Sequence, residues 1–453
     1  MFRRVAVANR GTVAARIIRA LRKLGVESHA LCSEADIQCP YAREADGATV
    51  IGPAPPKESY LSHEKVIAAA LAAKAEAIHP GYGFLAEDAA FARKALEKGL
   101  AFIGPSPRFL DIMGDKVAAR EAMGRAGLPL GASTGVLSGT LEERAEEAAR
   151  IGFPLLVKPA GGGGGIGMIP VWERDKLLSA LKTAASQAER GFGKSDLYAE
   201  RLVENPRHVE FQVVAKDGEG VHLFERDCSI QRRRQKIIEE AGAPGIARAE
   251  LLKMAALSRD ILAGMGYDHL ATVETLYGEE TGFGFLEVNP RLQVEHAVTE
   301  EITGADLVVA QLRLASGEKV SDIFPAQPAW ESGWAIEARV YAEDSHKFLP
   351  SPGPLKVFRP PVMDGVRVET GFAEGGAITP FYDPMIAQVI AKGPDRLAAA
   401  DLLFEALGAF AIEGLKTNIG FLRSALRHES FLAGKVHANL AAEIIADPHY
   451  RPL

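Results

Sequence analysis

Glu287-Val-Asn-Pro-Arg-Leu-Gln-Val-Glu-His296 is the most informative stretch of this sequence. In an extended backbone, side chains point alternately to the two faces of a strand. Leu286, Val288, Leu292 and Val294 then share a buried face. The opposite face carries carboxylates, amides and a guanidinium, from Glu287, Asn289, Arg291, Gln293 and Glu295. Mixed polar groups fixed on a strand suit a site for a metal ion, a phosphate and a small anion. The alternative is the solvated outer face of an edge strand.

The preceding strand supplies a further carboxylate. Residues 269–277 are predicted to form a strand, and residues 278–282 to form the turn into residues 283–289. A hairpin symmetric about Glu280 and Thr281 places Glu274 directly opposite Glu287. Like charges that face each other across a ladder destabilise it unless a cation lies between them. Mg²⁺ prefers oxygen ligands and accompanies substrate phosphates, so we predict a magnesium site at this hairpin.

The composition restricts the class of protein. A chain of 453 residues exceeds one typical domain, and 47% hydrophobic and 25% charged residues are typical of soluble globular proteins. The net charge of -7 argues against a nucleic-acid binder. No apolar run suits a membrane span, and Met1-Phe-Arg-Arg4 leads into a strand without a signal peptide. Cys32, Cys39 and Cys228 fit no metal spacing and no disulfide framework. We therefore expect a cytoplasmic protein without nucleic-acid or membrane partners.

The first 112 residues predict a doubly wound α/β domain. Residues 4–8 form an apolar strand, Asn9-Arg-Gly11 turns the chain, and residues 12–24 have the spacing of an amphipathic helix. Strand and helix patterns then alternate. No Gly-x-Gly-x-x-Gly follows the first strand, so a dinucleotide site is not expected. The loop at residues 79–87 gathers two glycines, a histidine and a carboxylate, either for a site or for a tight structural turn.

Five consecutive glycines at residues 161–165 follow the strand at residues 154–157 and Lys158. Such a run costs folding entropy and buries nothing, but it lets backbone amides surround a phosphate chain. The lysine precedes the loop, unlike the Walker pattern, and is predicted to point its ammonium at nucleotide phosphates. Because the loop lies on a small segment between larger units, we predict a mobile lid over about residues 131–203. The alternative is a flexible linker.

Two further clusters carry charge. Acids at Glu225, Asp227, Glu239 and Glu240 flank the basic run at residues 231–236, which favours a substrate site over a nucleic-acid patch. The alternative is a solvated charged face. Glu337, Arg339 and Tyr341 share one face of a strand predicted from Trp334 to Ala342. Arg339 either serves an anionic or carbonyl group or pairs with Glu337.

Together, these segments closely resemble biotin carboxylase, an ATP-grasp ligase. The matching segments run in order along nearly the whole chain: Ala8-Asn-Arg-Gly11, His79-Pro-Gly-Tyr-Gly-Phe-Leu85, Met113-Gly-Asp-Lys116, residues 161–168, Glu204-Asn-Pro-Arg-His-Val-Glu210, Glu225-Arg-Asp-Cys-Ser229, residues 287–296, Phe348-Leu-Pro-Ser-Pro-Gly353 and Gly414-Leu-Lys-Thr-Asn418. The resemblance implies an α/β fold, α+β in the ATP-grasp part. It places an N-terminal doubly wound domain at residues 1–112, an ATP-grasp unit with the mobile lid at 113–315, and a C-terminal biotin-carboxylation domain at 334–445.

The implied reaction uses ATP, Mg²⁺ (or Mn²⁺) and bicarbonate to form carboxyphosphate, which carboxylates biotin on a carrier protein. Matched position by position, the resemblance implies that ATP phosphates contact Lys116, Lys158, Gly164 and Gly165. It assigns the adenosine to Glu200, Arg201, Leu202, Val203 and His208. It assigns magnesium to Glu274, Glu287 and Asn289, and the bicarbonate pocket to Lys236, Arg291, Gln293 and Val294. Glu295 would deprotonate bicarbonate, and Arg339 would stabilise the biotin enolate.

Two positions depart from the family pattern. Ile166 stands where the lid loop of the family usually carries a basic residue. An apolar residue at this position resembles carboxylases that act on less common acceptors, such as urea carboxylase. Arg234 stands where a histidine is usual, beside the nucleotide and bicarbonate sites. It retains a donor and adds a permanent charge.

The expected partners lie on other chains. The biotin-accepting sequence Ala-Met-Lys-Met does not occur here, so the biotin carboxyl carrier protein and the carboxyltransferase are expected as separate polypeptides, and the chain itself as a homodimer. We expect the first half-reaction of an acyl-CoA carboxylase of the acetyl-CoA type. The alternatives are a pyruvate, urea or other carboxylase, a different ATP-grasp carboxylate–amine ligase, and an inactive carrier-binding scaffold.

Overall fold

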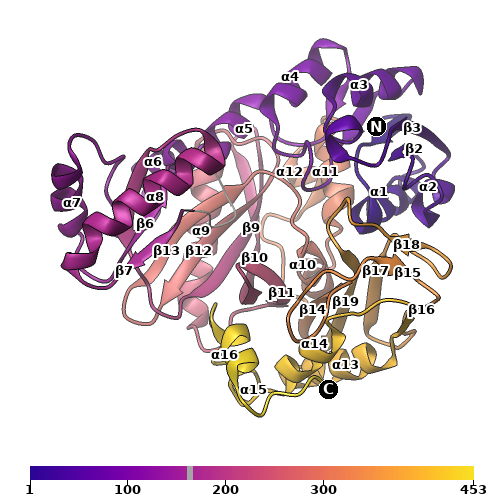
Figure 1. Cartoon of the computed structure of the whole chain (residues 1–453). Helices are drawn as coiled ribbons and strands as arrows, with labels where there is room; N and C mark the ends of the chain where they lie inside the picture. The colour runs from indigo at the N-terminus through magenta and orange to yellow at the C-terminus, as the bar shows by residue number, and fades with distance from the viewer. Residues whose placement is uncertain (161–166) are drawn as a thin grey trace.

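A parallel sheet forms the N-terminal part of the chain, as seen in a computed structural model that describes residues 1–160 and 167–453 (Figure 1). The strand order is β3-β2-β1-β4-β5, with each neighbouring pair parallel. The strands are β1 (Arg4–Val7), β2 (Glu27–Ser33), β3 (Gly47–Gly52), β4 (Ala77–His79) and β5 (Ala101–Phe102), and the helices are α1 (Gly11–Lys23), α2 (Pro40–Glu44), α3 (His63–Ala72) and α4 (Ala89–Glu97). The predicted doubly wound architecture is confirmed.

Helix α1 shows how the local sequence produces this part of the fold. The chain turns at Gly11, whose φ of +62° suits glycine. Val13, Ile17 and Leu21 then recur at helical spacing and are almost completely buried against the sheet.

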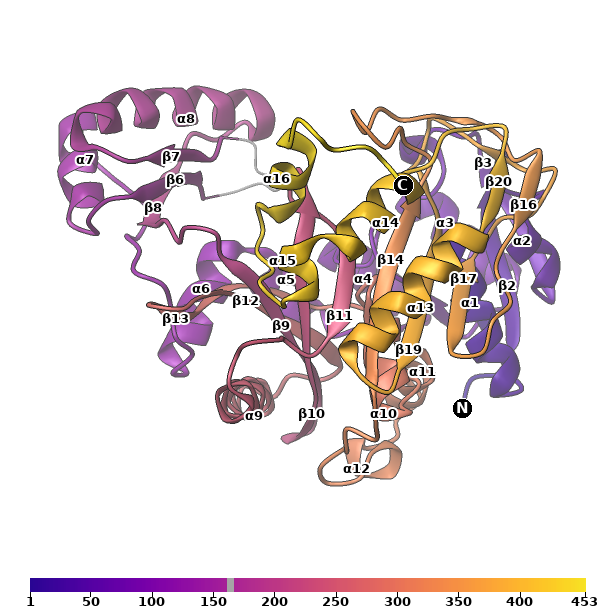
Figure 2. The ribbon, with the colours of Figure 1, turned by 90° about the horizontal axis from the view of Figure 1, so that it is seen from below.

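A small antiparallel sheet of order β7-β6-β8 lies at one side of the molecule (Figures 1 and 2). Its elements are β6 (Leu155–Pro159), β7 (Ile169–Val171), β8 (Leu197–Arg201), α7 (Leu141–Ala149) and α8 (Leu177–Phe192). It has an apolar core of its own, which includes Val157, Val171 and Leu181. The glycines at residues 161–165 and Ile166 lie outside the described residues.

An eight-stranded antiparallel sheet, in the order β13-β12-β9-β10-β11-β14-β19-β17, joins the rest of the chain. Its strands are β9 (Arg207–Lys216), β10 (Glu219–Arg232), β11 (Gln235–Ala241), β12 (Leu270–Gly278), β13 (Gly282–Asn289), β14 (Trp334–Tyr341), β17 (Val366–Thr370) and β19 (Met385–Gly393). Pairing between β11 and β14 carries this one sheet from the predicted ATP-grasp unit into the C-terminal part. Helix α9 (Arg248–Gly264) packs on β9 and β10, and α13 (Arg396–Ala409) packs on β14 and β19 (Figure 2).

The remaining elements connect and cover these sheets. They are α5 (Pro107–Gly114), α6 (Lys116–Arg125), α10 (His296–Thr303), α11 (Leu307–Ala315), α12 (Val320–Ile323), α14 (Ile419–Arg427), α15 (Glu429–Leu432), α16 (Leu440–Ala446), two 3₁₀ turns (Pro56–Glu58, Arg174–Lys176), β15 (Gly353–Pro354), β16 (Val357–Arg359), β18 (Ala377–Ile378) and β20 (Ala411–Glu413). Within residues 1–160 and 167–453, no helix has both the length and the apolar character needed to cross a membrane.

The β12–β13 hairpin confirms the predicted register at one point and corrects it at another. Glu274 faces Glu287, as predicted. Nearer the turn, however, Tyr277 faces Phe283, so the hairpin is centred on Glu280 there. A bulge between these positions adds one residue to β13 and brings the two glutamates into register.

The prediction that the strand continues to His296 is wrong. Strand β13 ends at Asn289, residues 290–295 are irregular, and α10 begins at His296. Pro290 has no backbone N–H to donate to a ladder, which explains why pairing stops there. The alternation used to place Arg291, Gln293 and Glu295 on one strand face therefore does not apply to them.

Candidate active site

Lys236 lies at the centre of a cluster of carboxylates. Its Nζ atom is 2.6 Å from Glu210, 2.8 Å from Glu274 and 2.7 Å from Glu295. These carboxylates come from β9, β12 and the segment before α10, and all three are buried. They raise the pKa of Lys236 against the opposing effect of burial, so the lysine remains charged.

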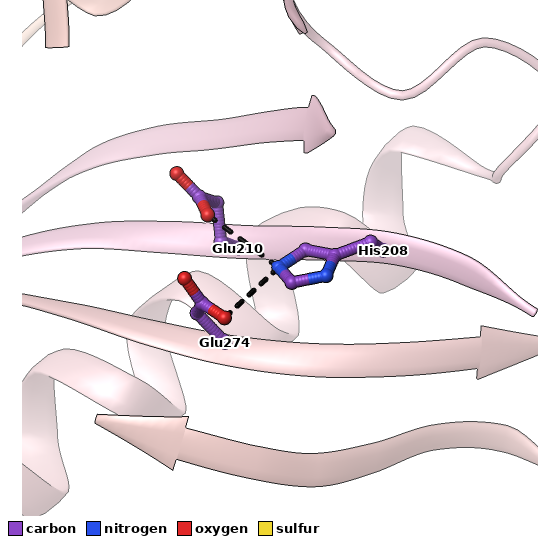
Figure 3. A group of neighbouring side chains, drawn as sticks. All are labelled: His208, Glu210 and Glu274. Carbon is purple, nitrogen blue, oxygen red and sulfur yellow. Dashed lines mark ion pairs between the residues drawn. The ribbon is translucent and has the colours of Figure 1, made fainter. Parts of the chain in front are cut away.

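The histidine beside this cluster is also a cation. His208 Nε2 lies 3.1 Å from Glu274 and 3.6 Å from Glu210, as Figure 3 shows. Burial and Lys236 oppose its protonation, but Glu274 and Glu210 outweigh them and raise the pKa of His208 to about 9. Burial likewise would raise the pKa of Glu274, yet Lys236 and His208 lower it to about 2. An imidazolium cannot ligate a metal ion, so His208 is an ion-pair partner in this state rather than a ligand.

The predicted magnesium residues lie together at the β12–β13 hairpin. Glu274 faces Glu287, and Asn289 Nδ2 donates to Glu274 at 2.8 Å. Lys116 Nζ lies 2.9 Å from Glu287, and Lys236 contacts Glu274, so a separate lysine neutralises each of the facing carboxylates. Repulsion between them therefore does not by itself require a metal ion. The donor set consists of carboxylate and amide oxygens beside two lysines, which fits a Mg²⁺ ion that arrives with nucleotide phosphates.

Two groups of metal-ligating atoms occur within the described part of the chain, and Glu287 is in neither. They are His208, Glu210 and Glu274, and Glu210, Cys228 and Glu295. Lys236 contacts Glu210, Glu274 and Glu295, which compensates their charge without an ion. Neither group therefore indicates a further metal site.

Arg339 pairs with Glu295 and not with Glu337. Its Nη2 atom donates to Glu295 at 3.0 Å, and its Nε atom lies 2.6 Å from Glu239. Glu337 instead accepts from Gln388 at 2.6 Å. Burial and Glu210 would raise the pKa of Glu295, but Lys236, Arg339 and Arg226 lower it. Glu295 is therefore an ionised carboxylate held between two cations from different strands.

Arg291 links the irregular segment after β13 to the loop between β4 and α4. Its guanidinium donates to Asn289 and Gln293, at 2.9 Å each, and it pairs with Glu87. Gln293 donates in turn to Glu274 at 3.1 Å. The residues that the alternation argument placed together are thus brought together by side-chain contacts instead.

A cavity of about 470 Å³ opens beside this cluster. Arg291, Val294 and Arg339 line one side of it, and residues 9–12 and 82–84 of the N-terminal part line the other. The loop at residues 79–87 therefore contributes to a site and is not merely a turn. His79 itself is structural: burial lowers its pKa to about 3, and its Nδ1 atom accepts from Gly81 N–H.

The residues predicted to bind the nucleotide fall into two sets. Arg201, Leu202 and Val203 line a larger cavity of about 900 Å³, together with residues 277–281 and 433–437. Glu200 lies apart from this lining and accepts from Lys158 at 3.0 Å, and His208 belongs to the Lys236 cluster. Burial opposes protonation of Lys158, but Glu200 raises its pKa. The structure does not describe Gly164 and Gly165.

Arg234 lies in the exposed turn between β10 and β11 and contacts Met168, the residue before β7. Arg233 and Arg234 both have positive φ, +50° and +66°, which is unusual for residues other than glycine, asparagine and aspartate. The basic run therefore divides: Lys236 enters the site, and Arg233 and Arg234 remain at the surface.

Sequence reasoning missed two residues of the site. Glu210 contacts Lys236. The fully buried Arg226 donates to Glu210 at 2.6 Å. Arg226 also reaches Gln212, Thr272 and Thr299. The alternation of His208, Glu210 and Gln212 with Val209, Phe211 and Val213 along β9 is the sequence signal that identifies Glu210. Val436 and His437, from the far end of the chain, give no such signal.

The fold and these sites match known families in chain order. "Biotin carboxylase, N-terminal domain" matches residues 1–110, "Carbamoyl-phosphate synthase L chain, ATP binding domain" matches residues 115–323, and "Biotin carboxylase C-terminal domain" matches residues 337–443. The biotin carboxylase of Halalkalibacterium halodurans is 45% identical over 436 residues, covering 96% of each chain. That of Pseudomonas aeruginosa is 42% identical and covers 99% of this chain and 100% of the relative.

Solved structures agree with these matches. The biotin carboxylase domain of the Hydrogenobacter thermophilus 2-oxoglutarate carboxylase, solved as a dimer with MgADP, ADP and bicarbonate, superposes with a TM-score of 0.91 at 39% identity. It covers 98% of both chains. The Campylobacter jejuni biotin carboxylase has a TM-score of 0.92 at 36% identity and covers 98% of this chain and 99% of its own.

The matched ATP-binding domain and the biotin carboxylase relatives identify the chain as an ATP-dependent ligase with an ATP-grasp unit. The chain belongs to the biotin carboxylase family. The activity of this family is the ATP-dependent carboxylation of biotin.

Proposed function

We propose that Lys236, Arg291, Glu295 and Arg339 form the catalytic centre, and that this chain is the cytoplasmic, homodimeric biotin carboxylase subunit of a multi-subunit carboxylase. The observation that carries the first proposal is the position of Glu295, between Lys236 at 2.7 Å and Arg339 at 3.0 Å. Arg339 and the neighbouring Arg291 both line the cavity of about 470 Å³. A small anion that enters this cavity meets two guanidinium groups, and one of them, Arg339, contacts Glu295, a carboxylate that can take a proton.

The basicity of Glu295 changes when the anion binds. In the structure, Lys236 and Arg339 lower the pKa of Glu295 and make it a weak base, against the effect of burial and Glu210. A bicarbonate ion beside Arg291 attracts these cations to its own oxygens. The negative charge of Glu295 is then less neutralised by these cations, so Glu295 becomes a better proton acceptor. The same cations stabilise the bicarbonate dianion that forms.

The proposed nucleotide site is based on the second cavity, of about 900 Å³. Arg201, Leu202 and Val203 lie where an adenosine fits, and Glu200 fixes the Lys158 ammonium near the phosphates. Lys116 forms an ion pair with Glu287 and so lies beside the proposed metal ligands. His208 forms an ion pair with Glu274 and fixes the position of that carboxylate. We assign further phosphate contacts to Gly164 and Gly165. Glu274, Glu287 and Asn289 would hold Mg²⁺, which when bound neutralises charge on the transferred phosphoryl group.

The remaining bicarbonate contacts come from Gln293 and Val294. Gln293 is fixed by Arg291 and Glu274, and the Val294 carbonyl accepts from Gln388 at 2.7 Å. Arg234 lies in the exposed turn between β10 and β11 and contacts Met168. We assign it to the nucleotide side, where it brings a donor and a permanent charge.

The partners and the final acceptor belong to the same proposal. We assign the biotinyl carrier protein and the carboxyltransferase to other chains, because this sequence contains no Ala-Met-Lys-Met. We propose an acetyl-CoA-type carboxylase, supported by the similarity to relatives named biotin carboxylase. A pyruvate carboxylase is the second candidate, because a pyruvate carboxylase polypeptide of Methanothermobacter thermautotrophicus is 42% identical over 445 residues. The proposed units are residues 1–112, 113–315 with a mobile lid at about 131–203, and 334–445.

The test measures ATP hydrolysis with bicarbonate and free biotin added separately and together. The proposal expects bicarbonate-dependent hydrolysis and biotin-dependent formation of carboxybiotin. Hydrolysis that ignores both additions contradicts it. Transfer from carboxybiotinylated carrier proteins to acetyl-CoA or to pyruvate, each with its own carboxyltransferase, then decides the acceptor.

A further inference from the structure

Glu239 and Glu337 are two buried carboxyl groups that face each other behind Arg339. They are register partners across β11 and β14, and neither is exposed to solvent. Residues directly opposite each other on neighbouring antiparallel strands have Cβ atoms about 4.5–5.5 Å apart, so their carboxyl groups can meet. Two ionised carboxylates in this buried position would repel each other strongly.

Their oxygen atoms lack the hydrogen-bond donors that two carboxylates require. Gln388 donates to Glu337 Oε1 at 2.6 Å, and Arg339 Nε lies 2.6 Å from Glu239 Oε1 as an ion pair. Neither Glu239 Oε2 nor Glu337 Oε2 accepts a hydrogen bond from any described residue. A buried polar atom without a partner costs about 1–3 kcal/mol. A proton between the two groups would satisfy an oxygen of each.

The surrounding charges favour retention of such a proton. Lys236 is occupied by three other carboxylates, and Arg339 is shared with Glu295. The other titratable groups that face the pair are acids or neutral: Glu210 on β9, Cys228 on β10, Glu295 before α10, Tyr341 on β14 and Tyr82. Burial raises the pKa of Glu239 to about 7, with Glu295 acting in the same direction and Arg339 against it. Burial and Glu239 raise the pKa of Glu337 as well.

We propose that Glu239 and Glu337 share one proton, and that the singly charged pair positions the Arg339 guanidinium beside Glu295. Neither residue lines the cavity of about 470 Å³, so the pair acts through Arg339, and this proposal rests on the role proposed for that arginine. Loss of the shared proton adds a second negative charge behind Arg339. The guanidinium is then drawn toward β11 and away from Glu295, and less carboxybiotin forms for each ATP cleaved.

The proton itself is tested without activity, by thermal melts of the whole protein between pH 5 and pH 9. Glu337→Gln mimics the protonated member, since its amide can donate to Glu239 and accept from Gln388. A carboxyl group with a raised pKa stabilises the fold below its ordinary pKa of 4.5, and this stabilisation is lost as the pH rises through the raised value. The melting temperature of Glu337→Gln should therefore rise relative to the wild type with increasing pH. The exposed Glu405→Gln on α13 should show no such trend. A difference between Glu337→Gln and wild type that is independent of pH would overturn the shared proton.

The positioning role is tested by the ratio of carboxybiotin to released phosphate. Glu337→Gln keeps one negative charge and should keep this ratio within about twofold near pH 7, but lose its decline at high pH. The double variant Glu239→Gln/Glu337→Gln removes the charge, and the ratio should fall about tenfold or more, as expected for loss of a charged hydrogen-bond partner. A double variant with the wild-type ratio contradicts the positioning role. Arg339→Gln with a wild-type ratio would instead refute the function proposed for Arg339, while the melts still decide whether the proton is shared.

Discussion

Glu274→Gln separates the metal-binding role of the hairpin from its structural role. Glu274 Oε1 lies 2.8 Å from Lys236 Nζ and from Asn289 Nδ2, and 3.1 Å from Gln293 Nε2. Its other oxygen lies 3.1 Å from His208. A glutamine of the same shape offers one uncharged oxygen and an N–H₂ group in place of a carboxylate. The positive charges of Lys236 and His208 are then less neutralised in a buried site.

The magnitude follows from the ionisation of Glu274. Its pKa falls from an ordinary 4.5 to about 2, because Lys236 and His208 overcome the effect of burial. A shift of this size corresponds to about 3 kcal/mol in favour of the folded state with an ionised carboxylate. This stabilisation is present above pH 4.5 and is lost as the pH falls through about 2. We therefore expect Glu274→Gln to be destabilised near pH 7 by about 2–3 kcal/mol and to approach the wild type toward low pH.

Glu287→Gln is the matched control. Glu287 faces Glu274, but its side chain is 30% exposed and its ion-pair partner is Lys116, itself 36% exposed. Its substitution should cost less than about 1 kcal/mol, as for exposed ion pairs. Both variants should lose most magnesium-dependent ATP cleavage. Thermal melts without magnesium, together with ATPase assays, measure the two effects. A Glu274→Gln protein as stable as wild type at pH 7 would refute the structural argument, and near-normal ATPase in either variant would refute the metal assignment.

Three further predictions concern the chemistry and the lid. Glu295→Gln should depress bicarbonate-dependent ATP cleavage itself. Arg339→Gln should leave much of that cleavage intact but uncouple it from the formation of carboxybiotin. Each variant should cost about 3–4 kcal/mol in the step that its residue serves, bicarbonate activation for Glu295 and biotin carboxylation for Arg339. Equal losses of phosphate and carboxybiotin in both variants would contradict this division. Lys158→Gln should raise the KM for ATP by about tenfold, the effect of losing one charged contact, and an unchanged KM would exclude phosphate binding by Lys158. Hydrogen exchange at residues 161–165 should slow when ATP binds; equal rates with and without ATP would contradict closure of the lid.

Much of the fold follows from local sequence, because its signals lie within single elements. The alternation of apolar strands and amphipathic helices predicts the N-terminal sheet, and the turn around Glu280 predicts a hairpin that sets Glu274 against Glu287. The sequence does not predict the bulge that produces this register. A bulge depends on how both strands pack, and no residue type specifies it.

The region after Asn289 shows where local periodicity fails. The residues alternate like a strand, but Pro290 ends the ladder and the chain becomes irregular before α10. Arg291 and Glu295 still reach the site, since Arg291 bonds to Asn289 and Glu295 pairs with Lys236. These side chains therefore lie together, although the strand geometry from which their grouping was inferred is wrong.

The sequence alone determined the order of the motifs, the family they resemble and the residue types available for phosphate, metal and anion chemistry. Only the tertiary structure decided which charges compensate one another. Lys236 meets Glu210, Glu274 and Glu295, and Arg339 meets Glu295 rather than its strand neighbour Glu337. The reason is physical. Sheet order joins β11 to β14 across about a hundred residues of chain, and burial then makes every unpaired charge costly, so the partners are set by non-local packing.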